Sequence, residues 1–153
     1  PGLSSVVAPS LPGMNPFELM AADVVATGVT PGLMPVEMVR SALSAQGVVP
    51  AAELLHGVED GTRVRVAGVI THRQHPATAG GVTFLGMEDE TGLINIVISV
   101  GLWNKQRVLA RTAKALVVRG IVQNASGAVS VVADRLEPLA MGELLSRGSR
   151  DFR

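Results

Sequence analysis

The chain has 153 residues and no cysteine, and its 13 basic and 13 acidic side chains give a formal net charge of zero. This length suffices for one domain with its own hydrophobic core, and the lack of cysteine excludes disulfide bonds and thiolate metal sites. No apolar run approaches the roughly 18 residues of a membrane-spanning helix, and the first residues lack the basic cluster of a signal peptide. We therefore expect a soluble, cytoplasmic protein with no membrane partner.

Charge is distributed unevenly along the chain. Residues 1–60 carry one basic and six acidic side chains, whereas residues 61–139 carry nine basic and five acidic ones. A change of charge that coincides with a change of sequence pattern indicates two units. We expect a helical and linker segment over residues 1–60, a domain over residues 61–139 and a C-terminal helix or tail over residues 140–153. The positive excess of the middle unit permits a polyanionic partner without requiring one.

The first unit contains signals for short helices. Asn15, Pro16 and Glu18 combine an N-cap residue, a proline at the first helical position and an acidic residue three positions after the cap. They predict a helix over residues 16–27, and similar signals predict a second helix over residues 35–46 and one further turn over residues 50–55. Short alanine-rich helices bury little surface by themselves, so we expect this unit to pack on another part of the protein.

From Gly61 onward, apolar and polar residues alternate with the period of β-strands. The pattern predicts five strands and one helix: strands over residues 63–71, 82–88, 93–99, 115–123 and 128–136, and a helix over residues 101–111. Gly68 marks a bend or bulge in the long first strand, residues 72–81 form a loop, and residues 124–127 form a hairpin turn. In the third strand, Ile94, Ile96 and Ile98 share one face.

Five strands with a helix between the third and the fourth match the order of the OB-fold. This fold is a small barrel that binds oligonucleotides or sugars on its second and third strands, flanked by the loops after the first and fourth strands. We therefore predict a mainly β protein with a five-stranded OB-fold barrel, preceded by a short helical segment. Another small antiparallel barrel is the alternative, and the position of the helix argues against it.

No group of residues has the spacing of an active site. His72 and His75 lie close together, but no further histidine or cysteine is near enough in sequence to complete a zinc site. Glu88, Asp89 and Glu90 form an acidic cluster that leads into a Thr-Gly turn, which favours a solvated hairpin over a Mg²⁺ site. We predict no catalytic residue, no metal site and no cofactor in this chain.

Candidate binding residues gather on the strands and on the first loop. Single-stranded nucleic acid needs cations along its phosphates and flat side chains under its bases. The candidates are Arg65 and Arg119 on the strands, His72, Arg73 and His75 in the first loop, and Phe84 in the second strand. The pattern leaves the direction of the Phe84 ring open, and we interpret Trp103 as a plug at the bottom of the barrel. An ordinary solvated face fits the arginines nearly as well.

Longer motifs extend over nearly the whole chain. They include LPGM at Leu11–Met14, THRQHPATAGGVTF at Thr71–Phe84, MEDETGLINIV at Met87–Val97 and VQNASGAVSVVADR at Val122–Arg135. In this order they resemble the C-terminal region of the error-prone C-family DNA polymerases of bacteria, the ImuC family. The HRQxPATA loop is the most particular of these motifs, whereas many OB domains have a version of the EDxTG hairpin.

The resemblance implies a parent protein that is a DNA-directed DNA polymerase of damage-induced translesion synthesis. This chain would be a noncatalytic part of it, which also fits the start at Pro1. The catalytic Mg²⁺ of the family would lie in a palm domain that this sequence does not contain. The resemblance further implies contact with single-stranded template DNA and docking of an ImuB-type Y-family accessory protein, with the sliding clamp reached indirectly. Arg150 and Phe152 in the tail are the candidate partner contacts.

Two functions from different classes follow. In the first, the barrel face binds single-stranded template DNA, with His72, Arg73 and His75 on phosphate and Phe84 under a base. In the second, the chain is purely a protein-docking module that uses apolar residues of the predicted helices, the sheet or the tail. The scarcity of aromatic residues favours docking, and the fold favours DNA. We expect the domain to do both through different faces.

Overall fold

The computed structural model describes residues 15–24, 35–75, 80–125 and 127–142. Its elements, in chain order, are α1 (Pro16–Val24), α2 (Pro35–Ala45), α3 (Ala51–Gly57), β1 (Arg63–Gln74), β2 (Thr83–Asp89), β3 (Gly92–Ile98), α4 (Val100–Lys105), α5 (Arg107–Thr112), β4 (Ala115–Ala125) and β5 (Ala128–Pro138). None of the described helices is long and apolar enough to cross a membrane.

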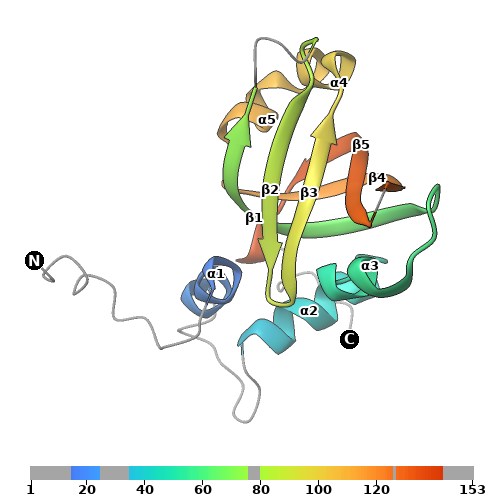
Figure 1. Cartoon of the computed structure of the whole chain (residues 1–153). Helices are drawn as coiled ribbons and strands as arrows, with labels where there is room; N and C mark the ends of the chain where they lie inside the picture. Colours follow the sequence, from blue (N-terminus) through green and yellow to red (C-terminus); the bar gives the residue numbers. More distant parts are fainter. Residues whose placement is uncertain (1–14, 25–34, 76–79, 126, 143–153) are drawn as a thin grey trace, which may run out of the picture.

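The five strands form a closed barrel in the order β1-β2-β3-β5-β4. Neighbouring strands are antiparallel except β3 and β5, which run parallel. Figure 1 shows α4 and α5 at one end of the barrel and α1, α2 and α3 at the other. The predicted five-stranded OB-fold, with its helical segment between the third and fourth strands, is confirmed.

Two differences from the prediction have a clear structural cause. Strand β1 continues through residues 72–74, which we expected in a loop, because these residues pair with β2. The helix predicted over residues 101–111 is two short helices, α4 and α5, separated at Gln106. The side chain of Gln106 explains the break, since its amide forms 2.8 Å hydrogen bonds with both the N–H and the carbonyl of Leu136. These long-range bonds fix Gln106 against β5 and outside helical geometry.

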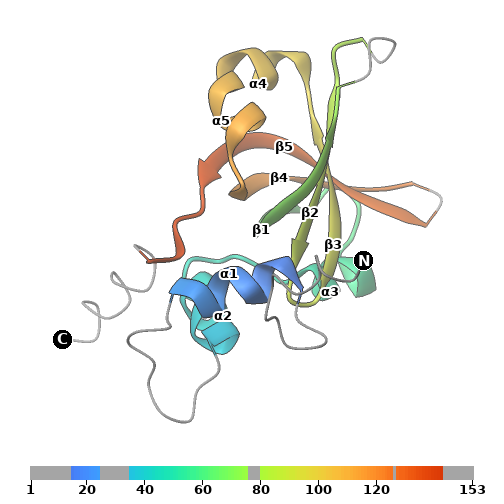
Figure 2. The same ribbon diagram turned by 90° about the vertical axis from the view of Figure 1, so that its left-hand side faces the viewer.

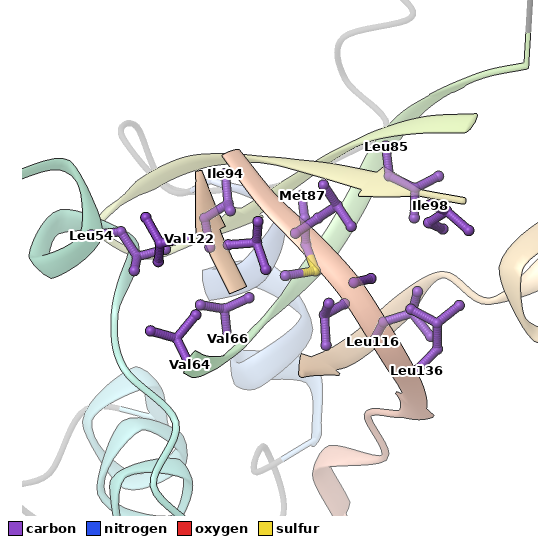
Figure 3. Close-up of a cluster of buried hydrophobic side chains, with 14 of the residues drawn as sticks. Leu54, Val64, Val66, Leu85, Met87, Ile94, Ile98, Leu116, Val122 and Leu136 are labelled. Atoms are coloured by element: carbon purple, nitrogen blue, oxygen red, sulfur yellow. The ribbon is translucent and has the colours of Figure 1, made fainter. Parts of the chain in front are cut away.

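The main core fills the barrel with inward residues of all five strands (Figure 3). Ile94, Ile96 and Ile98 lie inside together, as their spacing predicts. Leu102 and Ala110 close one end of the core, with Trp103 half-buried against it, and Leu54 of α3 closes the other. The barrel interior is therefore packed with side chains, which leaves its outer surface for binding.

Gly68 lies where β1 changes partners. Residues Arg63 to Val69 of β1 pair with β4, and residues Val69 to Gln74 pair with β2. A Cβ atom at Gly68 would lie 2.6 Å from the carbonyl oxygen of Glu88, so only glycine permits this approach of β2. The irregularity in the β1–β2 register comes slightly later, between Ile70 and His72.

Helices α1 and α2 pack on the outside of the barrel rather than away from it. Phe17 and Ala21 of α1 and Val39 and Leu43 of α2 are fully buried. They form a second core with residues of β1 and β4 and with the segment that follows β5, namely Ala67, Val117 and Met141. The predicted N-cap of α1 is confirmed, since Asn15 and Glu18 each accept a 2.9 Å hydrogen bond from the other's backbone N–H.

The acidic turn between β2 and β3 is not solvated, which corrects the prediction. Asp89 is fully buried and accepts hydrogen bonds from the backbone N–H groups of Ala51, Thr91 and Gly92. Arg40 of α2 donates to Asp89 at 3.1 Å and to both carboxylate oxygens of Glu90 at 2.8 Å. Burial by itself lowers the pKa of Arg40, but Glu90 and Asp89 raise it overall. The turn thus joins the helices to the barrel, and we call Arg40, Asp89 and Glu90 the hub.

Candidate nucleic-acid interface

An apolar row runs across the outside of the barrel. Cross-strand pairing places four outward side chains side by side: Phe84 on β2, Val97 on β3, Val132 on β5 and Ile121 on β4. Phe84 is 40% exposed and Ile121 is 38% exposed, and their place side by side with Val97 and Val132 is what distinguishes them from scattered exposed apolar residues. The structure therefore presents a continuous strip of apolar surface over four strands, and we call these four residues the apolar row.

The direction of the Phe84 ring, which the sequence left open, is outward. Thr83 and Leu85 on either side of it are buried, so alternation along β2 turns the ring to the surface. Thr83 tolerates its buried position because its hydroxyl is hydrogen-bonded to Nδ1 of His75. Thr83 is thus a polar residue that points inward, which is why the pattern along β2 left the direction of Phe84 open.

A row of polar and small residues lies next to the apolar row. In register across the same four strands are Gly86, Asn95, Ser130 and Gln123, and His72 of β1 pairs with Gly86. The imidazole of His72 lies over Gly86, where an added Cβ atom would come within 2.1 Å of the ring. His72 therefore sits flat on the outer sheet, and its neighbours carry groups that donate and accept hydrogen bonds.

His75 and Trp103 form a stacked pair at one end of these rows. Their ring centroids lie 4.7 Å apart and their planes differ by 21°. Trp103 belongs to α4 and also packs against the barrel core, so it closes the barrel on one side and holds His75 on the other. The pair holds the residue that directly follows β1 against α4, and His75 is exposed.

Arg73 points away from His72 and toward α5. Its Nε donates a 2.8 Å hydrogen bond to the carbonyl of Ala110, and a terminal nitrogen donates to the carbonyl of Ala113. Unpaired carbonyls and the dipole at the C-terminal end of a helix favour a cation there. Burial lowers the pKa of Arg73. In this structure the guanidinium therefore caps a helix, and the sequence-based role on phosphate stays a prediction.

Arg65 and Arg119 lie beyond the apolar row, on β1 and β4, and are engaged in ion pairs. Arg65 contacts Glu137 at 2.8 Å and the carbonyl of Gln46 at 3.1 Å. Arg119 contacts Asp134 at 2.7 Å. The remaining sequence-based candidates, Arg150 and Phe152, lie outside the described residues, as do residues 76–79 of the predicted loop.

Several surface residues were missed by the sequence analysis. The binding candidates did not include Asn95, Val97, Ser130 or Ile121. Alternation with the inward isoleucines of β3 nevertheless predicts that Asn95 and Val97 lie on the outer face. No local signal placed β5 and β4 beside them, because this depends on the pairing of β3 with β5. Figure 2 shows the β4–β5 hairpin projecting on the side of the barrel where β2 and β3 lie.

The described residues contain no group of three or more histidine, aspartate or glutamate side chains placed to hold a metal ion. The carboxylates of the acidic turn accept hydrogen bonds from Arg40, from the hydroxyl of Thr91 and from backbone N–H groups. What this surface offers is the exposed phenyl ring of Phe84, the imidazoles of His72 and His75, apolar and amide neighbours, and arginines at its edge.

Residues 64–139 match a family model described as an OB-fold nucleic acid binding domain. The whole chain is 67% identical to an error-prone DNA polymerase of Corynebacterium efficiens and 54% identical to an error-prone DNA polymerase of Mycobacterium tuberculosis. It spans about 14% of the length of each. An asparaginyl-tRNA synthetase of Pyrococcus horikoshii superposes with a TM-score of 0.48 and 25% identity, over 60% of this chain and 22% of that one.

Proposed function

We propose that this chain binds single-stranded template DNA. The premise is that the chain belongs to the error-prone DNA polymerases and that its residues 64–139 are an OB-fold nucleic-acid-binding domain. It would act as a noncatalytic module of a translesion polymerase in DNA-damage-induced mutagenesis. The polymerase activity would lie in regions outside this chain, which spans about 14% of the length of these relatives.

The observation that carries the proposal is the exposed ring of Phe84 within the apolar row. A base can stack on any aromatic face, and such a contact is worth roughly 1–3 kcal/mol. Val97 and Val132 extend the apolar surface beside the ring, and Asn95 and Ser130 offer hydrogen bonds next to it. This combination favours unpaired bases, because the bases of a duplex are stacked on each other.

The histidines have supporting roles in this proposal. His72 lies flat over Gly86 beside Phe84 and offers a second, smaller surface for a base or sugar. His75 is held by Trp103 and Thr83 at the end of the rows. Arg73 supports the site by capping α5 and so fixing the end of β1, which contains His72 and leads directly into His75.

The test is fluorescence anisotropy with a labelled oligothymidine of about 12 nucleotides, a length within the span of OB-fold sites. A duplex of the same length and two salt concentrations serve as controls for strand preference and electrostatics. Phe84→Ala should weaken binding of the single strand about tenfold or more, which corresponds to the loss of one stacking contact. Val108→Ala is the matched control, because Val108 is an exposed apolar residue of α5.

Wild-type protein that does not bind the oligothymidine at low salt would contradict the proposal and favour the protein-docking function. The helices then offer less exposed apolar surface for docking than the sequence suggested, because the apolar residues of α1 and α2 named above are buried on the barrel. An ImuB-type accessory protein would be sought on other surfaces, and a sliding clamp through that protein. A pull-down with those partner subunits is the experiment for this outcome.

A further inference from the structure

Four arginines lie close together on β1, β4 and β5, beyond the apolar row. We call them the arginine ladder: Arg63, Arg65, Arg119 and Arg135. Arg65 is directly opposite Arg119, and Arg119 is directly opposite Arg135. Neighbouring strands lie about 4.8 Å apart, and like charges in opposite positions repel each other. An arrangement of this kind needs anions to offset the repulsion.

The protein supplies two carboxylates for these four guanidinium groups. Asp134 lies between Arg63 at 2.9 Å and Arg119 at 2.7 Å, and Glu137 lies between Arg65 at 2.8 Å and Arg135 at 3.2 Å. The cluster therefore keeps an excess of two positive charges. The arginine side chains are 33–62% exposed, so an anion from solution can reach them.

The ladder continues the apolar row rather than forming a separate patch. Ile121, the last residue of the row, is paired with Arg63 on β1. Arg119 lies two positions from Ile121 along β4, on the same outer face. A strand of nucleic acid that leaves Phe84 across Val97, Val132 and Ile121 arrives at these arginines.

Resting on the proposed function, we propose that the arginine ladder is a second binding surface, on which phosphates of the nucleic-acid backbone replace Asp134 and Glu137 as partners of the arginines. A phosphate accepts two parallel hydrogen bonds from a guanidinium, as a carboxylate does. Ion pairs that are exposed contribute little to stability, so their exchange costs the fold little. The two carboxylates thus act as internal competitors that limit affinity.

The first test removes arginines and follows the salt dependence of oligothymidine binding by anisotropy. Each phosphate contact on a single strand contributes about 0.7 to the slope of log affinity against log salt. The double variant Arg63→Ala/Arg135→Ala should therefore lower the magnitude of this slope by about 1.4. The matched control is Lys105→Ala/Arg111→Ala, which removes the same charge from exposed positions of α4 and α5.

The second test removes a competitor. Asp134→Asn frees Arg63 and Arg119, so it should tighten oligothymidine binding severalfold and more than Glu53→Gln, which removes one negative charge from an exposed position of α3. A purely structural ion-pair network predicts the opposite pattern: lower stability for Asp134→Asn and an affinity no different from that of the Glu53→Gln control.

The outcomes separate this inference from the proposed function. One outcome is binding that depends on Phe84 while the ladder variants behave like their controls. That result would overturn the inference about the arginine ladder and leave the proposed function standing. If the oligothymidine does not bind, NMR of the arginine Nε–H signals with added inorganic polyphosphate tests whether the ladder binds anions at all. Shifts at the ladder would support an anion surface without the proposed function, and unshifted signals would overturn both.

Discussion

The barrel carries two clusters of arginine and carboxylate, and they differ in both burial and proportion. In the hub between β2 and β3, one guanidinium serves two carboxylates, and the side chains of Arg40, Asp89 and Glu90 are 17%, 0% and 15% exposed. In the arginine ladder, four guanidinium groups share two carboxylates, and the arginines are 33–62% exposed. The same residue types therefore meet in two very different environments.

The difference shows that burial decides which charges hold the fold together and which can bind another anion. A buried charge that loses its partner cannot be solvated, so the hub is committed to holding the helices on the barrel. An exposed charge is solvated with or without its partner, so the ladder can exchange its ion pairs for another anion. Stability measurements should respond to the hub, and binding measurements should respond to the ladder.

The largest effect is expected at the centre of the hub. Arg40→Ala leaves the buried Asp89 without its cation and should lower the free energy of unfolding by about 3 kcal/mol, measured by urea denaturation. Arg111→Ala, at an exposed position of α5, should change the free energy by less than about 0.5 kcal/mol. A loss below about 1 kcal/mol for Arg40→Ala would show that the hub is no more structural than a surface ion pair.

A smaller effect is expected when the charge of the hub is kept but its geometry is changed. Arg40→Lys loses the paired hydrogen bonds to Glu90 and should cost about 1–2 kcal/mol at neutral pH. The pKa of Arg40 is raised in the folded state, so its contribution is fully present below the ordinary arginine pKa and is lost only above that range.

Lysine has an ordinary pKa of about 10.4, so the stability gap between wild type and Arg40→Lys should widen as the pH rises through about 10. Urea denaturation at neutral and alkaline pH measures this gap, with Arg111→Lys as the control. A gap that stays constant across this range would mean that the charge at position 40 is not what the hub uses.

The smallest effect on stability is expected in the ladder. Arg119→Ala removes one exposed ion pair with Asp134 and should change the free energy of unfolding by less than about 1 kcal/mol. The same variant should lower the salt slope of oligothymidine binding by about 0.7. A large loss of stability together with an unchanged slope would reverse the comparison and make the ladder a structural element.

Most of the barrel was predictable from the sequence, because alternation of apolar residues and turn residues are local properties of the chain. Neighbours within a few residues predict the succession of strands and helix along the chain. They also predict the inward isoleucines of β3 and the cap of α1. For the same reason the outward position of Asn95 was within reach, and only the direction of Phe84 was ambiguous.

The environment of the acidic turn and the direction of Arg73 were not predictable. Asp89 is buried by Arg40 and Ala51, which lie 49 and 38 positions away, and Arg73 meets carbonyls 37 and 40 positions away. The ladder likewise depends on the registers of β1, β4 and β5, one of which shifts between Arg119 and Gly120. The sequence by itself determined which residues form strands, helices and turns. Only the tertiary structure decided which charges are buried and which meet across strands, because those contacts join residues that are distant in the chain.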